Sequence, residues 1–329
     1  MDKSASHRNA AWMVIAILLG VLLYFLHLGA NYSKAVSDAA AGGGARKLLQ
    51  SRESLYNNIY VFSEGDYVSM TFGYNRRIYT ESIYDTKDEL DLPVSYTRFM
   101  TASLIYAKDV HSILEIGFGG GRTAWYLHRS LPDVKITSVE LDPAIVDLSH
   151  KYFGIKDEPN FEVINEDGRK FLANSKDHYD IILVDAYRGP FVPFHLLTVE
   201  FYHLLKDHLS DGGVVAQNVE PSTMLFDSAV ATIHSVFPQL DFYLSDGNVV
   251  TIAYDGPERS AGDLARAATE RQQQFDLRYN LTQMLAMRRH FDPNMTGAID
   301  AKAKILTDDF APVEMLKAIE NHNRKWPDK

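Results

Sequence analysis

The sequence predicts an α/β protein: a doubly wound, mostly parallel sheet of seven strands, preceded by a small N-terminal β domain and an N-terminal transmembrane helix. Short apolar strands alternate with helical segments, and four successive strands end in acidic or glycine-rich tips. Residues 59–72 alternate apolar and polar side chains, as a half-buried antiparallel sheet does. The seven expected strands cover residues 113–116, 135–139, 160–164, 179–184, 212–218, 241–244 and 248–254.

The first of these strands runs into a glycine-rich turn. Gly117, Gly119 and Gly121 follow the apolar residues 113–116, and a helical segment begins directly after them. Glycine permits positive φ angles and lets backbone N–H groups approach a ligand without a Cβ in between. The next strand ends in Glu140, about twenty residues farther on, where a carboxylate can accept the hydroxyl groups of a ribose. Together these features predict a nucleoside site.

The next two strand ends narrow the class of ligand. Asp167 and Gly168 follow one strand, and Asp185 follows the other. In a doubly wound sheet the carboxyl ends of the strands form the ligand crevice. Acids there suit a ligand that offers hydroxyl groups, an amino group and a positive charge, so S-adenosylmethionine or its decarboxylated form fits better than NAD. The alternative is that Asp167 and Asp185 only cap helices.

The patterns divide the chain into five parts. Residues 1–30 are predicted to be a membrane anchor helix, and residues 31–51, with an Ala- and Gly-rich centre, a flexible tether. Residues 52–91 form the small antiparallel β domain. Residues 92–257 form the catalytic, nucleoside-binding domain with a Rossmann fold like that of class I S-adenosylmethionine methyltransferases, and residues 258–329 form a helical C-terminal extension.

Composition and charge exclude several classes of protein. The formal net charge of −10 argues against a nucleic-acid partner, because phosphate binding needs a basic face. The chain has no cysteine, which excludes disulfides, thiolate metal sites and a cysteine nucleophile. The spacing of His195, His203 and His208 does not place all three on one helical face, so no metal is expected.

Four further motifs occur in the order expected of one known family. They are Glu53-Ser54-Leu55-Tyr56, Tyr96 before the first long helix, Ser138-Val139-Glu140-Leu141-Asp142 and Glu166-Asp167-Gly168. Together they resemble the spermidine synthase-like polyamine aminopropyltransferases over residues 53–257. Residues 185–187, 193–198 and 306–312 look most like the membrane-associated branch of that family.

The resemblance implies roles for individual residues. It assigns Asn57 and Asp167 to the bound donor and places Tyr96 and Asp185 closest to the incoming amine. It also implies a homodimer, with a small-molecule amine as the acceptor. Glu115, just before the glycine turn, is similar to the acid that faces the methionine portion of the cofactor in S-adenosylmethionine methyltransferases.

Two departures from the family fall at the reacting centre. Gly120 stands where spermidine synthases carry an aspartate that meets the amine of the donor, and Arg188 replaces the second acid of their gate loop. Arginine stays protonated, so it would repel a diamine and cannot act as a general base. Three hypotheses follow: aminopropyl transfer from decarboxylated S-adenosylmethionine to a polyamine, transfer of a methyl or other group from intact S-adenosylmethionine, or a catalytically silent nucleoside-binding module.

The predicted anchor consists of Ala10 to Leu26, which carry no charge and would form a helix of about 25 Å, close to the thickness of a bilayer core. Trp12 and Tyr24 resemble interfacial aromatic residues. A cleaved signal peptide is the alternative. The basic residues on the two sides do not decide the orientation, but the expected cofactor places the catalytic domain in the cytoplasm, with a single-pass N-terminal anchor.

Overall fold

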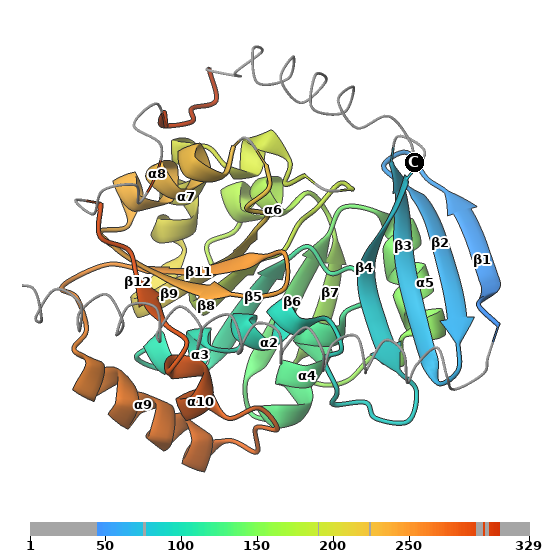
Figure 1. Ribbon diagram of the computed structural model, residues 1–329, viewed down its shortest axis with the longest axis horizontal. Coiled ribbons are helices and arrows are strands. Elements are labelled where there is room, and N and C mark those ends of the chain that lie inside the picture. The colour runs from blue at the N-terminus through green and yellow to red at the C-terminus, as the bar shows by residue number, and fades with distance from the viewer. Residues whose placement is uncertain are drawn as a thin grey trace, which may run out of the picture. The chain divides into compact units, whose positions relative to one another are not determined.

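The computed structural model describes residues 45–74, 77–189, 191–223, 225–293, 299 and 303–309. One compact unit comprises Leu48–Phe62 and Asp66–Lys329 and contains every site residue discussed below, whereas a second unit comprises Met1–Lys47 and Ser63–Gly65. In the first unit a large sheet lies at the centre with helices on both of its faces, and the N-terminal strands form a smaller sheet beside it (Figure 1).

The large sheet has eight strands in the order β12-β10-β11-β9-β8-β5-β6-β7. The strands from β9 to β7 are parallel, and β11, β10 and β12 extend one edge antiparallel. The predicted α/β class is confirmed, but the predicted number of seven strands is wrong, because β12 has only two residues and therefore no periodic pattern. The bounds are β5 Ser112–Ile116, β6 Lys135–Glu140, β7 Phe161–Asn165, β8 Tyr179–Val184, β9 Leu209–Val219, β10 Gln239–Leu244, β11 Val249–Tyr254 and β12 Arg289–His290.

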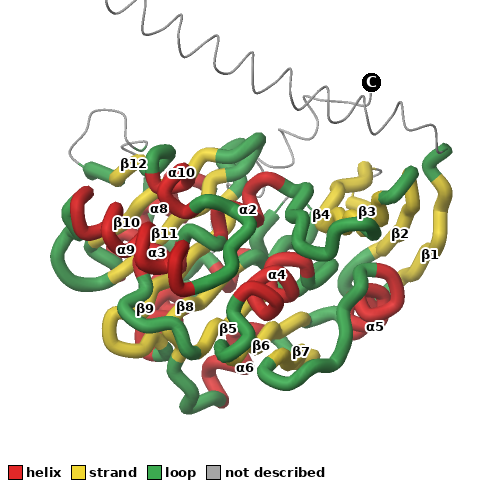
Figure 2. The backbone as a smooth tube through the Cα atoms, turned by 90° about the horizontal axis from the view of Figure 1, so that it is seen from below, coloured by secondary structure: helices red, strands yellow, loops and turns green. Residues whose placement is uncertain are grey.

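Helices cover both faces of this sheet. Ile113 and Ile181 pack in one apolar cluster with residues of α4 and α9, whereas their neighbours Leu114 and Ile182 pack in another with α7 and α8. Parallel strands buried on both faces need nearly continuous apolar sequence, which these strands have. Figure 2 shows the helices around the sheet from a second direction. They are α2 Ser95–Met100, α3 Ser103–Tyr106, α4 Arg122–Ser130, α5 Pro143–Tyr152, α6 Gly168–Asn174, α7 Val199–Asp207, α8 Phe226–Val236, α9 Ala261–Gln274 and α10 Leu281–Leu285, with a short 3₁₀ helix at Phe194–Leu196.

The smaller sheet has the order β1 (Lys47–Glu53), β2 (Asn58–Glu64), β3 (Tyr67–Tyr74) and β4 (Arg77–Asp85). Strands β3 and β4 pair antiparallel. Alternate side chains such as Ile59, Val61 and Met70 are buried and belong to the same apolar cluster as α4. Residues 47–51, predicted as part of the tether, therefore lie in strand β1.

Some predictions fall outside the described residues. The anchor helix at residues 1–30 lies there, together with residues 31–44 of the tether and residues 310–329 of the C-terminal extension. Within the part of the chain that is described, no helix is long and apolar enough to cross a bilayer. The described part of the extension contains α9, α10 and the edge strand β12.

A buried carboxylate attaches the middle of this extension to the large sheet. Asp241 on β10 is 0% exposed. Its Oδ2 accepts a hydrogen bond from Arg288 Nε at 2.6 Å, and its Oδ1 lies 2.8 Å from His290 Nδ1. Glu258 approaches the same two side chains, Arg288 and His290, at 3.5 and 3.8 Å, but its own side chain is 53% exposed. The buried carboxylate therefore carries the interaction.

We expect Asp241→Asn to lower the free energy of unfolding by about 3–5 kcal/mol, because removing one partner leaves a buried charge uncompensated. The matched control Glu258→Gln should lower the free energy of unfolding by less than about 1 kcal/mol. At an exposed site water can replace the lost ion pair, so its contribution to stability is small. Urea unfolding followed by circular dichroism measures both. Equal losses in the two variants would contradict this account.

Candidate functional site

The carboxyl ends of β5 to β8 open into a cavity of about 710 Å³ with a mainly apolar wall, a size typical of small-molecule sites. Gly121, one of the ten predicted site residues, does not line it. It is the N-cap of α4, with a φ of 68°. The nine predicted residues that do line it are Asn57, Tyr96, Glu115, Gly117, Gly119, Glu140, Asp167, Gly168 and Asp185.

The glycine turn needs glycine for two reasons. Gly117 and Gly119 have φ angles of 92° and 53°, in the left-handed region that favours glycine. A Cβ on Gly117 would also lie 2.5 Å from the carbonyl oxygen of Asp185. The turn therefore brings the ends of β5 and β8 together at a distance that no side chain permits.

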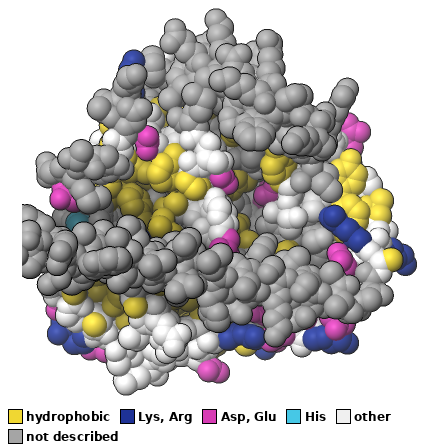
Figure 3. Space-filling model, in the orientation of Figure 1, with side chains coloured by type: hydrophobic (Ala, Val, Ile, Leu, Met, Phe, Trp, Pro, Cys, Tyr) yellow, Lys and Arg dark blue, Asp and Glu magenta, His cyan; other side chains and the backbone are white. Residues whose placement is uncertain are grey.

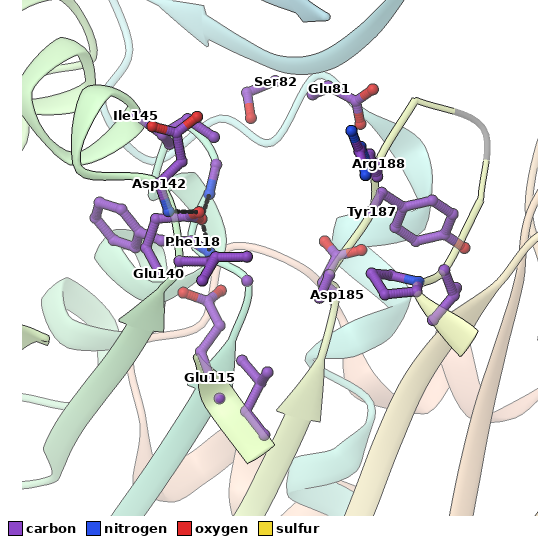
Figure 4. Close-up of a pocket in the computed structure, with 18 of the residues that line it drawn as sticks. Glu81, Ser82, Glu115, Phe118, Glu140, Asp142, Ile145, Asp185, Tyr187 and Arg188 are labelled. Carbon is purple, nitrogen blue, oxygen red and sulfur yellow. Dashed lines mark hydrogen bonds between the residues drawn. The ribbon is translucent and has the colours of Figure 1, made fainter. Parts of the chain in front are cut away.

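Glu140 holds this turn through its carboxylate. Its Oε2 accepts hydrogen bonds from the backbone N–H groups of Phe118 (3.0 Å) and Gly119 (3.3 Å), and its Oε1 accepts one from Asp142 N–H (2.9 Å) (Figure 4). Burial raises the pKa of Glu140 in spite of these three bonds, which lower it. A carboxylate has about four acceptor positions, so one remains on Oε1 for a ligand hydroxyl.

Glu115 lies at the end of β5 and is 3% exposed. The hydroxyl of Ser138, on the neighbouring strand β6, donates a hydrogen bond of 2.8 Å to its Oε2. Burial raises the pKa of Glu115 well above its usual value, and the charges of Asp185 and Glu140 add to this effect. The neutral acid is therefore favoured in the absence of a cation.

Asn57 lines the cavity and is held in place there by a neighbouring acid, Asp142. Its Nδ2 donates to Asp142 Oδ2 at 3.2 Å, and the hydroxyl of Ser54 donates to the same oxygen at 2.5 Å. The other oxygen of Asp142 caps α5 by accepting from Ala144 N–H. The loop between β1 and β2 is thus fastened to the segment that follows Glu140.

Asp167 caps the N-terminus of helix α6, as the alternative interpretation of the sequence predicted. Its Oδ1 accepts from Lys170 N–H at the start of α6, while its Oδ2 lies 3.3 Å from His195 Nε2. That contact with His195 lowers the pKa of Asp167. Asp308 in the C-terminal segment binds Arg169 through two hydrogen bonds, of 2.8 and 2.5 Å. The C-terminal segment therefore supports the α6 loop from outside the cavity.

Asp185, just after β8, has a side-chain donor on each of its two carboxylate oxygens. Tyr96 OH donates to its Oδ2 at 3.0 Å, and Asn218 Nδ2 donates to its Oδ1 at 2.9 Å. Burial raises the pKa of Asp185 to about 6, although both hydrogen bonds oppose this shift. The carboxylate is ionised at neutral pH and fixed in orientation, as a proton acceptor must be.

Gly120 leaves no room for the side chain that the family carries there. A Cβ on Gly120 would lie 2.7 Å from Ser82 Cβ and 2.7 Å from Phe153 Cδ1. The Ser82 hydroxyl instead accepts a hydrogen bond of 2.8 Å from Gly120 N–H. An acid at this position is excluded by packing.

Arg188 lines the cavity and makes no ion pair with any residue that the structure describes. Figure 4 shows it on the side of the cavity opposite Glu115. In the wider view of Figure 3, acidic side chains lie among apolar ones in the middle of the face, whereas basic side chains lie at its periphery. Arg188 is thus a cation in a mainly acidic site.

Sequence patterns missed Glu81, which lines the cavity from strand β4 (Figure 4). Burial raises its pKa to about 8, and the charge of Asp185 adds to the effect. Residues 78–83 carry no motif, and the position of Glu81 depends on a local shift in strand register that no pattern announces. Across the described residues, no group of three or more metal-ligating side chains is present.

Comparison with known proteins agrees with this geometry. A family model for the spermine/spermidine synthase domain matches residues 95–246. The polyamine aminopropyltransferase of Vibrio vulnificus is 29% identical over 287 residues, which cover 83% of this chain and 93% of that protein.

Solved structures show the same fold. A probable spermidine synthase from Corynebacterium glutamicum superposes with a TM-score of 0.63 at 20% identity, covering 80% of this chain and 97% of the other. A spermidine synthase in complex with the transition-state analogue AdoDATO superposes with a TM-score of 0.58 at 22% identity, covering 73% and 83%. The comparisons do not separate the membrane-associated branch from the rest. With the strand-end acids and the glycine turn in place, this chain carries a spermine/spermidine synthase domain over residues 95–246 and is similar to the polyamine aminopropyltransferases, which are transferases.

Proposed function

We propose that this protein transfers an aminopropyl group from decarboxylated S-adenosylmethionine to an amino group of a polyamine. The observation that supports this most directly is the set of desolvated carboxyl groups around one apolar cavity. Glu115, Glu140 and Asp185 point into it from three strand ends (Figure 4). Such a cavity attracts cations, and both the donor sulfonium and a protonated amine are cations.

In this proposal the donor lies along the glycine turn. The remaining acceptor position of Glu140 receives a ribose hydroxyl, and Asp167 with Gly168 contacts the adenine. A Cβ on Gly168 would lie 2.3 Å from Ile116 Cγ2, so only glycine allows α6 to approach β5 so closely. Asn57 lines the cavity and also holds Asp142.

The chemistry requires an uncharged amine in line with the carbon attached to the sulfonium. Asp185 is the proton acceptor for that amine because it is ionised at neutral pH and held by Tyr96 and Asn218. The protein contributes mainly orientation and removal of one proton.

A second candidate is transfer of a methyl or other group from intact S-adenosylmethionine. Arg188 favours it, because a cavity-lining cation without an ion pair among the described residues can bind the carboxylate that the decarboxylated donor lacks. A homodimer and attachment to a membrane through residues 10–26 stay predictions from the sequence.

Donor preference decides between the two candidates. We expect the full chain to bind decarboxylated S-adenosylmethionine at least about tenfold more tightly than the intact compound, because the acidic cavity repels a carboxylate. Isothermal titration calorimetry with each donor measures this. Tighter binding of the intact donor would favour the second candidate, and binding without turnover of any amine would leave a silent module.

Glu140→Gln should weaken the binding of either donor about 10- to 100-fold, the usual effect of losing one hydrogen bond to a charged group. Glu166→Gln is the matched control, since Glu166 follows the next strand, pairs with Lys170 and does not line the cavity. Its donor affinity should equal that of the wild type. Equal affinity of wild type and Glu140→Gln would remove the ribose assignment.

Asp185→Asn should lower kcat about 100-fold or more with little change in donor affinity, because a proton acceptor is lost. Tyr96→Phe removes a hydrogen bond that stabilises the ionised carboxylate, so the pKa of Asp185 should rise above about 6. The acidic limb of the kcat/KM profile should then move to higher pH. An unchanged limb, or one displaced to lower pH, would show that Asp185 is not the titrating group.

A further inference from the structure

Strand β4 contains an irregularity at the cavity. Across the β3–β4 pair, Met70 lies opposite Ser82 and Thr71 lies opposite Thr80, so Glu81 is an extra residue without a partner. Regular strands point successive side chains to opposite faces, yet Glu81 and Ser82 both line the cavity (Figure 4). Bulges of this kind redirect side chains and often occur next to active sites. The bulge places Glu81 in the cavity.

One oxygen of the Glu81 carboxyl group lacks a hydrogen-bond partner among the described residues. Its Oε1 is shielded from solvent and makes no hydrogen bond. A buried acceptor without a donor costs free energy, so the group is suited to a donor that arrives with a ligand. Burial and the charge of Asp185 raise the pKa of Glu81 to about 8.

The other titratable groups near Glu81 belong to three elements. Asp185 ends β8, Tyr96 lies on α2 and Tyr187 lies in the loop after β8. The pKa values of Tyr96 and Tyr187 are raised first by burial and then by nearby acids, among them Glu81. Arg188 in the same loop forms no ion pair with Glu81. The group therefore lacks a cation among the described residues of the chain.

Packing around Gly120 leaves β4, and not the glycine turn, to provide an acid through Glu81. Position 120 is closed to any side chain by Ser82 and Phe153. Position 120 therefore supplies no acid to the cavity, whereas the bulge supplies one from the smaller sheet.

We propose that Glu81 is the second carboxylate of the reacting centre and that, together with Asp185, it binds the ammonium group of the acceptor. This inference rests on the proposed function and narrows its substrate class to primary amines that enter as cations. A cation between the two acids offsets their repulsion, so both can ionise. Binding of the ammonium then releases one proton from Glu81 to solvent.

Transfer follows with balanced charge. The ammonium gives one proton to a carboxylate of the pair, and the neutral nitrogen forms the new N–C bond. The C–S bond breaks, and its electron pair neutralises the sulfonium to a thioether. The product is a secondary ammonium, and the transferred proton leaves to solvent.

Calorimetry tests the proton release. We would titrate 1,4-diaminobutane into the full chain at pH 7, with saturating 5′-methylthioadenosine, in two buffers of different ionisation enthalpy. The wild type should release close to one proton for each diamine bound. Glu81→Gln should release almost none and should bind the diamine at least about tenfold more weakly, while its affinity for the nucleoside stays within twofold of the wild type. The matched control Glu89→Gln, outside the cavity, should behave as the wild type.

Thermal unfolding shows that the variant folds and checks the burial of Glu81. The pKa of this acid is raised from 4.5 to about 8 in the folded protein, so the unfolded chain ionises first as the pH rises. Glu81 therefore destabilises the fold increasingly from about pH 4.5 to pH 8, and Glu81→Gln should have a Tm equal to that of the wild type at pH 4 and a higher one at pH 8.

Wild-type diamine affinity and proton release in Glu81→Gln would overturn the inference. Failure of the proposed function would look different, because the wild type would then either not bind the nucleoside or bind intact S-adenosylmethionine more tightly than the decarboxylated donor. In that case the same diamine titration without nucleoside decides the role of Glu81.

Discussion

Desolvation of carboxyl groups at the ends of parallel strands is the constraint on which the rest of this site depends. An acid removed from water must find donors or take up a proton. Glu140 accepts hydrogen bonds from backbone N–H groups of the glycine turn, and Glu115 accepts one from Ser138. Asp185 accepts hydrogen bonds from Tyr96 and Asn218. These contacts order the turn, the strand ends and α2 around one cavity.

The two sheets contribute differently to that cavity. The large sheet brings strand-end acids together because parallel strands place their carboxyl ends at one edge. The smaller sheet closes the other side, where the bulge in β4 presents Glu81 and Ser82. Ser82 fills the space next to Gly120, so the departure from the family at position 120 and the acid on β4 belong to one packing arrangement.

Much of this was predictable from local patterns. The glycine turn, Glu140 and Asp185 are recognisable because strand, turn and acid lie close together in sequence, and the α/β class follows from repeated apolar strands. The eighth strand was not predictable, since Arg289 and His290 carry no periodicity and are held by a distant pairing with β10. The sequence did not decide whether Asp167 caps a helix or binds a ligand, because an aspartate just before a helix is suited to either role.

The sequence by itself determined which strands and acids exist and which family the chain resembles, because these depend on residues that are near neighbours. Only the tertiary structure decided that Gly120 has no space for a side chain, that Asn57 bonds to Asp142, and that Glu81 enters the cavity. Each of these depends on contacts between residues far apart in the chain, and the last depends on a one-residue shift in strand register. A shift of that kind moves a side chain from one face of a sheet to the other without leaving any periodic trace in the sequence.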